Sequence, residues 1–199
     1  IGAFYRQIGE FEKGKNALNE SISLLASYKK IYKRSSRLNY IAALINRANI
    51  QWHIGDLQAG LQDFNKALNL LRWHRSKDIE IASLKAQIYM NKGVMLREMG
   101  QFTEAEKDSR RAVEMYQNLS ASQKNNYQNM LSISMVNLAC ALNELNYFED
   151  SLNWLNAALT IFENSSDNLY EETLRHRLHA QIMKAATFTK IGHFKESED

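Results

Sequence analysis

Apolar residues recur along this chain at spacings of three and four positions, as they do on one face of an α-helix. Two examples of such runs are Leu61, Phe64, Leu68 and Leu71, and Leu152, Leu155, Leu159 and Phe162. The pattern predicts a succession of amphipathic helices. Proline, which would interrupt a helix, is absent from the sequence.

The helical runs are separated by a short cassette that occurs five times. Each cassette holds an apolar residue, a turn residue, a polar residue and then an aromatic residue or Leu, at Ile8–Phe11, Ile54–Leu57, Met99–Phe102, Leu145–Phe148 and Ile191–Phe194. The turn residues are Gly9, Gly55, Gly100, Asn146 and Gly192, so consecutive cassettes lie 45 or 46 residues apart. A fixed period in this range indicates a stacked repeat array.

Each cassette is predicted to join two antiparallel helices through a tight turn. The residue after a helix end often adopts the left-handed conformation, which glycine enters without a side-chain clash and asparagine tolerates next best. We therefore expect a left-handed turn at all five turn residues.

Small residues occupy matched positions around the turns. Seven positions before the turn residue lie Gly2, Ala48, Gly93, Ala139 and Ala185; five after it lie Gly14, Gly60, Ala105, Ser151 and Ser197; twelve after it lie Ser21, Ala67, Ala112 and Ala158. Close crossing of two helices would exclude larger side chains at these positions.

These columns are those of the tetratricopeptide repeat, and the whole chain resembles that family. The resemblance implies an all-α fold, a right-handed superhelical solenoid of antiparallel helix pairs. Three features depart from the usual pattern: the usual period is about 34 residues, the closing proline is missing, and Leu57 replaces an aromatic residue. HEAT and armadillo arrays have periods of about 40–47 residues, but they lack the cassette and the alanine columns.

The additional residues in each repeat are expected to lengthen the helices, since the segments 36–52 and 127–145 are helix-compatible throughout. We expect residues 1–199 to form a single solenoid that is an excerpt of a longer protein. Its repeat units are predicted at 1–28, 34–73, 79–118, 124–163 and 168–199.

By the same resemblance, the first helix of each pair lines a concave surface. Nine positions before the turn residue, on that face, lie Asn46, Asn91 and Asn137. An amide side chain can bracket the peptide groups of an extended ligand, and each hydrogen bond contributes on the order of 1 kcal/mol. An equally open interpretation is that these asparagines bond to a neighbouring helix and hold the repeats in register.

The predicted ligand-binding set is completed by four residues on the same face: Asn49, Trp52, Arg97 and Asn143. Trp52 is the candidate hot spot, because tryptophan is enriched at such positions. Arg97 is the only basic residue assigned to this face, which disfavours the carboxylate clamp by which chaperone-binding members hold a carboxy-terminal tail.

We therefore expect a protein–protein interaction module that binds a partner peptide or protein segment along the concave groove. The alternative is a ligand-sensing regulatory domain that controls an effector domain outside this excerpt. Long-period members of the family exist, including those that resemble kinesin light chains and bacterial peptide-sensing regulators. Repeat arrays usually present binding surfaces, and we expect no enzyme activity.

Composition adds limits to this interpretation. The net charge is +3, with 25 basic and 22 acidic residues, so no global attraction to nucleic acid or anionic lipid is implied. Cys140 is the only cysteine, which excludes an internal disulfide and favours a reducing, cytoplasmic setting. We expect a protein or peptide partner, no nucleic acid, no membrane, and self-association through exposed ends of the array.

Two weaker sequence signals, a possible metal triad and two basic segments, have simpler structural explanations. Glu172, His176 and His179 have the spacing of a metal triad on one helix face, but Arg175 and Arg177 bring positive charge to that site. The basic and aromatic residues of segments 28–37 and 72–75 fit solvated connections between repeats. Cys140 is expected to be a small core residue, and we expect no catalytic residue, no metal and no cofactor.

Overall fold

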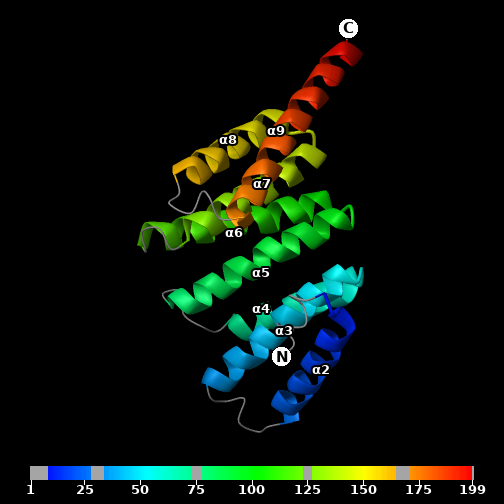
Figure 1. Cartoon of the computed structure of the whole chain (residues 1–199), viewed down its shortest axis with the longest axis vertical. Coiled ribbons are helices and arrows are strands. Elements are labelled where there is room, and N and C mark those ends of the chain that lie inside the picture. The colour runs from blue at the N-terminus through cyan, green and yellow to red at the C-terminus, as the bar shows by residue number, and fades with distance from the viewer. Residues whose placement is uncertain (1–8, 28–33, 73–77, 123–126, 165–170, 199) are drawn as a thin grey trace. The chain divides into compact units, whose positions relative to one another are not determined.

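The computed structural model describes residues 9–27, 34–72, 78–122, 127–164 and 171–198. Within these ranges every regular element is an α-helix (Figure 1). The helices are α2 (Phe11–Ser27), α3 (Arg34–His53), α4 (Leu57–Leu71), α5 (Ile79–Glu98), α6 (Phe102–Ser122), α7 (Gln128–Glu144), α8 (Phe148–Asn164) and α9 (Glu171–Glu198). The chain divides into two compact units, Ile1–Ile81 and Ala82–Asp199.

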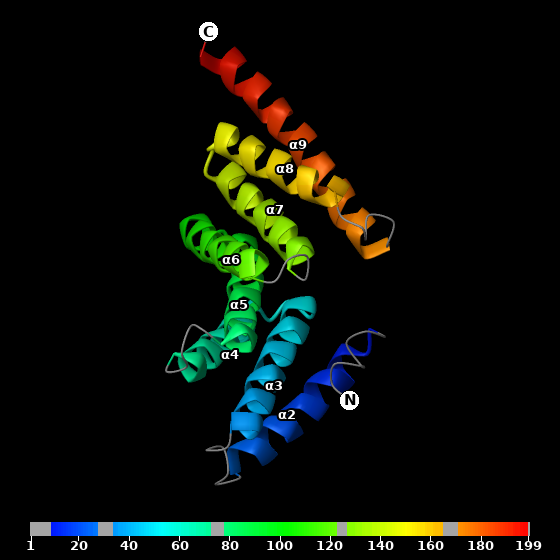
Figure 2. The ribbon, with the colours of Figure 1, turned by 90° about the vertical axis from the view of Figure 1, so that its left-hand side faces the viewer.

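The first unit contains α2, α3 and α4, with α3 packed against both of the others (Figure 2). Its interior is aliphatic and aromatic. Ile41, Leu44 and Ile50 of α3 are fully buried, as are Phe64 and Leu71 of α4. Burying an apolar side chain of this size stabilises the fold by about 1.5–3 kcal/mol.

The second unit contains almost all of α5 together with α6 to α9. α6 packs on α7, α7 on α8, and α9 on both α8 and α7. One apolar cluster includes a buried residue from every helix: Ala86, Tyr116, Leu138, Phe162 and Ala180. The expected all-α helical repeat fold is therefore confirmed, whereas the assembly of both units into a single solenoid stays a prediction.

The turns form for the reason given by the sequence. Gly9, Gly55, Gly100 and Asn146 have φ angles of 76°, 82°, 74° and 63°. At Gly55 the next amide, of Asp56, donates to the carbonyl of Gln51 at 2.8 Å, and the Gly55 amide donates to Trp52 at 3.0 Å. This paired arrangement is the Schellman motif, which satisfies carbonyl groups at the end of a helix.

The prediction of a fifth left-handed turn, at Gly192, is wrong. α9 continues through Gly192 to Glu198, and Gly192 does not have a positive φ. A left-handed turn is maintained where a second helix packs back on the first. With no helix packed back on α9 among the described residues, glycine stays helical at a cost of about 1 kcal/mol relative to alanine. Ile8, Gly2 and the side chains of His193 and Phe194 lie outside the described residues.

The small-residue columns bring paired helices into direct contact. A Cβ added to Gly93 on α5 would lie 2.5 Å from Ser109 Oγ and 3.3 Å from the Ala105 carbonyl, both on α6. In the next pair, Ser151 Oγ of α8 donates to the Ala139 carbonyl of α7 at 2.9 Å. Larger residues at either point would push the helices apart.

Ion pairs join the two helices of two pairs at matched positions. Eight positions before the turn, Arg47 donates two 2.7 Å hydrogen bonds to Asp63, which lies eight positions after it. Lys92 and Asp108 occupy the same two positions around Gly100, with Lys92 Nζ 3.0 Å from the carboxylate. The Asp63 and Asp108 side chains are 7% and 6% exposed. Each aspartate is therefore nearly buried and depends on its cation.

Replacing Gly100 and Gly192 with alanine should have opposite effects. Gly100→Ala forces a Cβ into the left-handed region and should lower the free energy of unfolding by about 1–2 kcal/mol. Gly192→Ala should instead stabilise the end of α9 by up to about 1 kcal/mol. Denaturant unfolding measures the first change, and amide hydrogen exchange over α9 measures the second. A loss of protection in Gly192→Ala would contradict the helical Gly192.

Removing the charge of Asp63 should destabilise the first unit strongly. Asp63→Asn leaves Arg47 without its bidentate partner, and we expect the free energy of unfolding to fall by about 2–4 kcal/mol. The control is Glu106→Gln, which breaks the pair with Arg110 one turn further along α6, where the arginine side chain is 44% exposed, and should cost less than about 0.5 kcal/mol. Equal effects in urea denaturation would refute the structural role assigned to the buried pair.

Candidate binding surface on the first helices

The structure distributes the predicted ligand-binding residues over three first helices. Asn46, Asn49 and Trp52 lie on α3 in the first unit. The second unit holds the other four residues, with Asn91 and Arg97 on α5 and Asn137 and Asn143 on α7. The asparagine ladder within the second unit therefore consists of Asn91 and Asn137.

In the first unit these side chains are partly engaged in packing. Asn49 is buried, and Asn46 and Trp52 are half-buried. The Trp52 ring stacks on His53 with centroids 5.2 Å apart, and His53 stacks on Phe11 of α2 at 5.0 Å. The aromatic rings thus link the start of α2 to the end of α3, and the role of Trp52 as a binding hot spot stays a prediction.

In the second unit Asn143 has an unusual environment. It is 1% exposed, and its side-chain carbonyl oxygen, Oδ1, has no hydrogen-bond partner in the structure. A buried acceptor without a partner costs about 1–3 kcal/mol, and such groups are rare in folded proteins. Asn143 lies three positions before its turn residue, and Arg97 occupies the same position on α5. An external donor that reached Oδ1 would recover part of this cost.

Charged groups on α5, α7 and α9 all influence the pKa of Cys140. Burial raises the pKa of the Cys140 thiol, Arg97 and Lys190 lower it, and Glu144 raises it. Burial also lowers the pKa of His179 on α9, and the Arg97 guanidinium lowers it further. The charge of Arg97 on α5 therefore influences one residue of α7, Cys140, and one residue of α9, His179. The buried Cys140 matches the expectation of a small core residue.

The sequence analysis missed the contribution of α9 to this region. His179 was considered there only as a metal ligand, and Lys190 was not considered. The repeat register could have indicated this contribution, because Lys190 and Glu144 occupy equivalent positions. Each lies two positions before its turn residue, Gly192 or Asn146. Without the structure, nothing indicated that the charge of Arg97 would reach α9.

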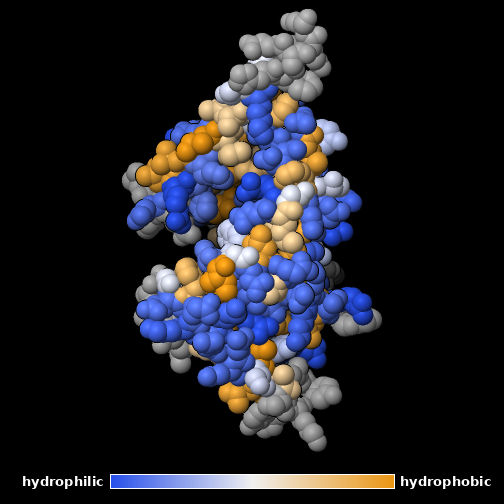
Figure 3. Space-filling model, turned by 90° about the vertical axis from the view of Figure 1, so that its right-hand side faces the viewer, coloured by the Kyte–Doolittle hydropathy of each residue, from blue (hydrophilic) through white to orange (hydrophobic). Residues whose placement is uncertain are grey.

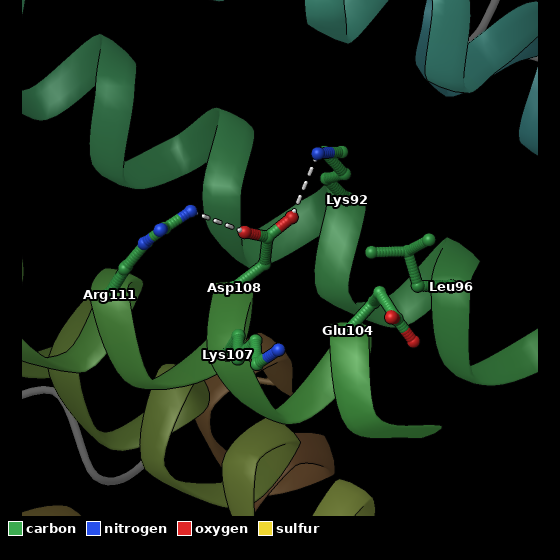
Figure 4. A pocket seen from close by; sticks show the side chains of 6 residues that line it. All are labelled: Lys92, Leu96, Glu104, Lys107, Asp108 and Arg111. Atoms are coloured by element: carbon green, nitrogen blue, oxygen red, sulfur yellow. Dashed lines mark hydrogen bonds and ion pairs between the residues drawn. The ribbon is translucent and has the colours of Figure 1, made fainter. Parts of the chain in front are cut away.

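A separate shallow pocket of about 220 Å³ lies between α5 and α6 (Figure 4). Its walls are Lys92, Leu96, Glu104, Lys107, Asp108 and Arg111. The Asp108 carboxylate contacts Lys92 at 3.0 Å and Arg111 at 3.2 Å. Since both cations already engage this carboxylate, the pocket offers no buried group that lacks a partner, and we assign it no function.

Other sequence signals remain without structural support. The described residues contain no group of three or more His, Cys, Asp or Glu side chains that could hold a metal ion. The Glu172 side chain and segments 28–33 and 73–77 lie outside the described residues. No described helix is long and apolar enough to cross a membrane. Hydrophilic residues predominate on the face shown in Figure 3, with hydrophobic residues scattered among them.

Comparison with known proteins gives one family and several similar folds. Residues 84–164 match the tetratricopeptide repeat family. BtubC (BKLC) from P. vanneervenii is 17% identical, with a TM-score of 0.73 over 100% of this chain and 73% of that one. A Podosopora anserina protein described as a kinesin light chain with nearly identical TPR-like repeats is 16% identical, with a TM-score of 0.70 over 99% and 86% of the two chains. No curated protein sequence matches this chain.

Replacing Arg97 should change the titration of His179. Arg97→Gln removes a nearby positive charge, so the pKa of His179 should rise toward its ordinary value near 6.5. NMR titration of the His179 ring measures this directly. Arg110→Gln on α6 is the control and should leave the titration unchanged. An unshifted His179 in Arg97→Gln would show that α5 and α9 do not interact in this way.

The sign of the stability effect follows from the same shift. Since the folded pKa of His179 lies below the unfolded one, the folded state binds fewer protons as the pH falls through about 6.5. The contribution of His179 to stability is therefore present above that pH and is lost below it. His179→Gln should make unfolding less sensitive to pH between about 7 and 5, as measured by urea denaturation at each pH.

Proposed function

Because residues 84–164 match the tetratricopeptide repeat family, we propose that the chain binds a partner peptide or protein segment along its first helices. The family match and the similar folds identify it as a helical repeat interaction module. The specific surface we propose is the face of α5, α7 and α9 that includes Asn91, Asn137, Arg97 and Asn143.

The single observation that carries this proposal is the buried Asn143 oxygen without a hydrogen-bond partner. It lies on α7, the central first helix of the second unit, in the position that Arg97 occupies on α5. A donor from a bound peptide, such as a backbone N–H or a side-chain amide, would satisfy this oxygen after a rotation of the Asn143 side chain, which is 1% exposed in this structure. The uncompensated cost of about 1–3 kcal/mol would then become part of the binding free energy.

The asparagine ladder defines the path of the ligand across successive first helices. Asn91 and Asn137 are both half-buried and occupy the same register on successive first helices. Packed helices lie about 8–10 Å apart, and an extended chain rises about 3.3 Å per residue. One asparagine would therefore meet the ligand about every third residue. A segment of about eight residues would cross α5, α7 and α9, and on α9 the ladder position holds Met183.

The charges of this face favour a ligand with at least one acidic group. Arg97 and Lys190 lower the pKa of Cys140, Arg97 also lowers the pKa of His179, and Glu144 is the opposing charge that raises the pKa of Cys140. An acidic side chain near Arg97 would face a net positive field. The Asn91 and Asn137 amides would bind the peptide backbone regardless of sequence, so Arg97 would supply selectivity.

The test is to select ligands from a displayed library of random linear peptides and to measure the best one by fluorescence anisotropy. Two hydrogen bonds of about 1 kcal/mol each predict that the variant Asn91→Ala with Asn137→Ala binds about 30-fold more weakly. The matched control replaces two exposed asparagines on second helices, Asn118→Ala with Asn153→Ala, and should change affinity less than about twofold.

Circular dichroism first establishes that both double variants remain helical. If the ladder variant keeps full affinity but melts at a lower temperature, the asparagines hold the repeats together and do not bind ligand. If the library yields no peptide that responds to Arg97→Gln, the proposed face is not the binding surface.

A further inference from the structure

His179 lies on the side of α9 that is turned away from α8. Two positions earlier in the chain, Arg177 contacts Glu163 of α8, with a nitrogen–oxygen distance of 3.7 Å. Residues two positions apart point to nearly opposite sides of an α-helix, because each residue turns the helix by about 100°. The contact of Arg177 with α8 therefore places His179 on the opposite side of α9.

The next residue, Ala180, shows how close His179 lies to α7. Ala180 is 0% exposed and belongs to the same apolar cluster as Val136 and Cys140 of α7, and α9 packs on α7. His179 itself is exposed. Its imidazole therefore lies at the rim of the contact between α7 and α9, where it can exchange a proton with the solvent.

His179 shares its side of α9 with residues of the proposed peptide-binding face. Met183 and Lys190 lie four and eleven positions after it, so all three project from one side of the helix. Met183 occupies the ladder position on α9, nine before Gly192, as Asn137 does on α7 before Asn146. A peptide that follows the asparagine ladder onto α9 would therefore pass beside His179.

The charges that act on this region are mainly positive. The guanidinium of Arg97 lowers the pKa of His179, and Glu144 is the carboxylate that opposes Arg97 and Lys190 in their effect on Cys140. On α8, Glu163 is engaged by Arg177 on the other side of α9. The ionisable groups around His179 are Arg97 of α5, Cys140 and Glu144 of α7, and Arg175, His176 and Lys190 of α9 itself.

An acidic ligand would change the balance of these charges. Without it, a proton on His179 adds a positive charge that Arg97 repels. A carboxylate bound near Arg97 would attract the imidazolium as well as the guanidinium. Protonation and ligand binding would then favour each other, and by thermodynamic linkage each would strengthen the other by the same factor.

We propose that protonation of His179 strengthens the binding of an acidic peptide to the face of α5, α7 and α9, so that affinity rises as the pH falls. This inference rests on the peptide-binding function proposed above and adds its regulation. Histidine changes its charge between about pH 5 and 8, whereas aspartate and glutamate in a peptide remain ionised above about pH 5.5. The change in affinity over this range therefore comes from the protein.

The test uses a library-selected peptide whose affinity responds to Arg97→Gln, labelled with a dye that is insensitive to pH. Its dissociation constant is measured by fluorescence anisotropy at about pH 7.5 and 5.5 and constant ionic strength, after circular dichroism has shown that the chain is helical at both values. We expect up to about fivefold tighter binding at the lower pH, the upper range for one exposed ion pair. His179→Gln should abolish this gain.

His176→Gln is the matched control, because it removes an imidazole one turn earlier on α9, outside the register of the peptide-binding face. It should keep the full gain in affinity at low pH. A peptide whose acidic residues are replaced by asparagine or glutamine should bind equally well at both pH values. A gain that persists in His179→Gln, or that disappears in His176→Gln, would overturn the proposal.

NMR titration of the His179 ring reads the linkage directly. The pKa of His179 should be higher with saturating peptide than without it, because protonation and binding strengthen each other. An unchanged pKa in the complex would refute the inference, as would a peptide that binds equally at both pH values, although either result would leave the peptide-binding function standing. A library without any peptide that responds to Arg97→Gln would instead overturn the proposed function, and this regulation with it.

Discussion

The close crossing of two antiparallel helices at each turn is the contact on which the other features depend. At the crossing, Gly93 lies against Ser109, and Ala139 accepts a hydrogen bond from Ser151. The approach is possible because the side chains there are small, and the chain can return at that distance because Gly100 and Asn146 adopt the left-handed conformation. Small residues and a positive φ are thus two parts of one constraint.

Once the crossing is fixed, every other position on a pair has a determined neighbour. The position eight before the turn faces the position eight after it, so the pairs Arg47–Asp63 and Lys92–Asp108 form in the same place in two repeats. Positions directed away from the second helix remain for other contacts. The same register that holds each pair together therefore also determines which positions remain free for other contacts.

The proposed peptide-binding surface combines a buried polar atom with charged groups. Around Cys140 a buried polar group without a partner, Asn143, lies on a face whose charges come from three helices. Under the function proposed above, such a surface takes a ligand that supplies hydrogen bonds and negative charge.

The sequence determined the features that depend on local geometry. The period of 45 or 46 residues, the helical spacing, the left-handed turns at four positions and the small residues at the crossings were all readable, because each depends on residues a few positions apart. The same local logic failed at Gly192. A glycine permits a left-handed turn but does not require one, and packing of a second helix is what makes the turn favourable.

Tertiary structure alone decided the properties that need several helices at once. It allowed the charge of Arg97 to act on His179, left the Asn143 oxygen without a partner, and buried Asn49. Burial and electrostatic fields depend on distances between helices that are far apart in the chain. A sequence pattern gives the face on which a residue lies, whereas only the packed neighbours decide whether that face is covered.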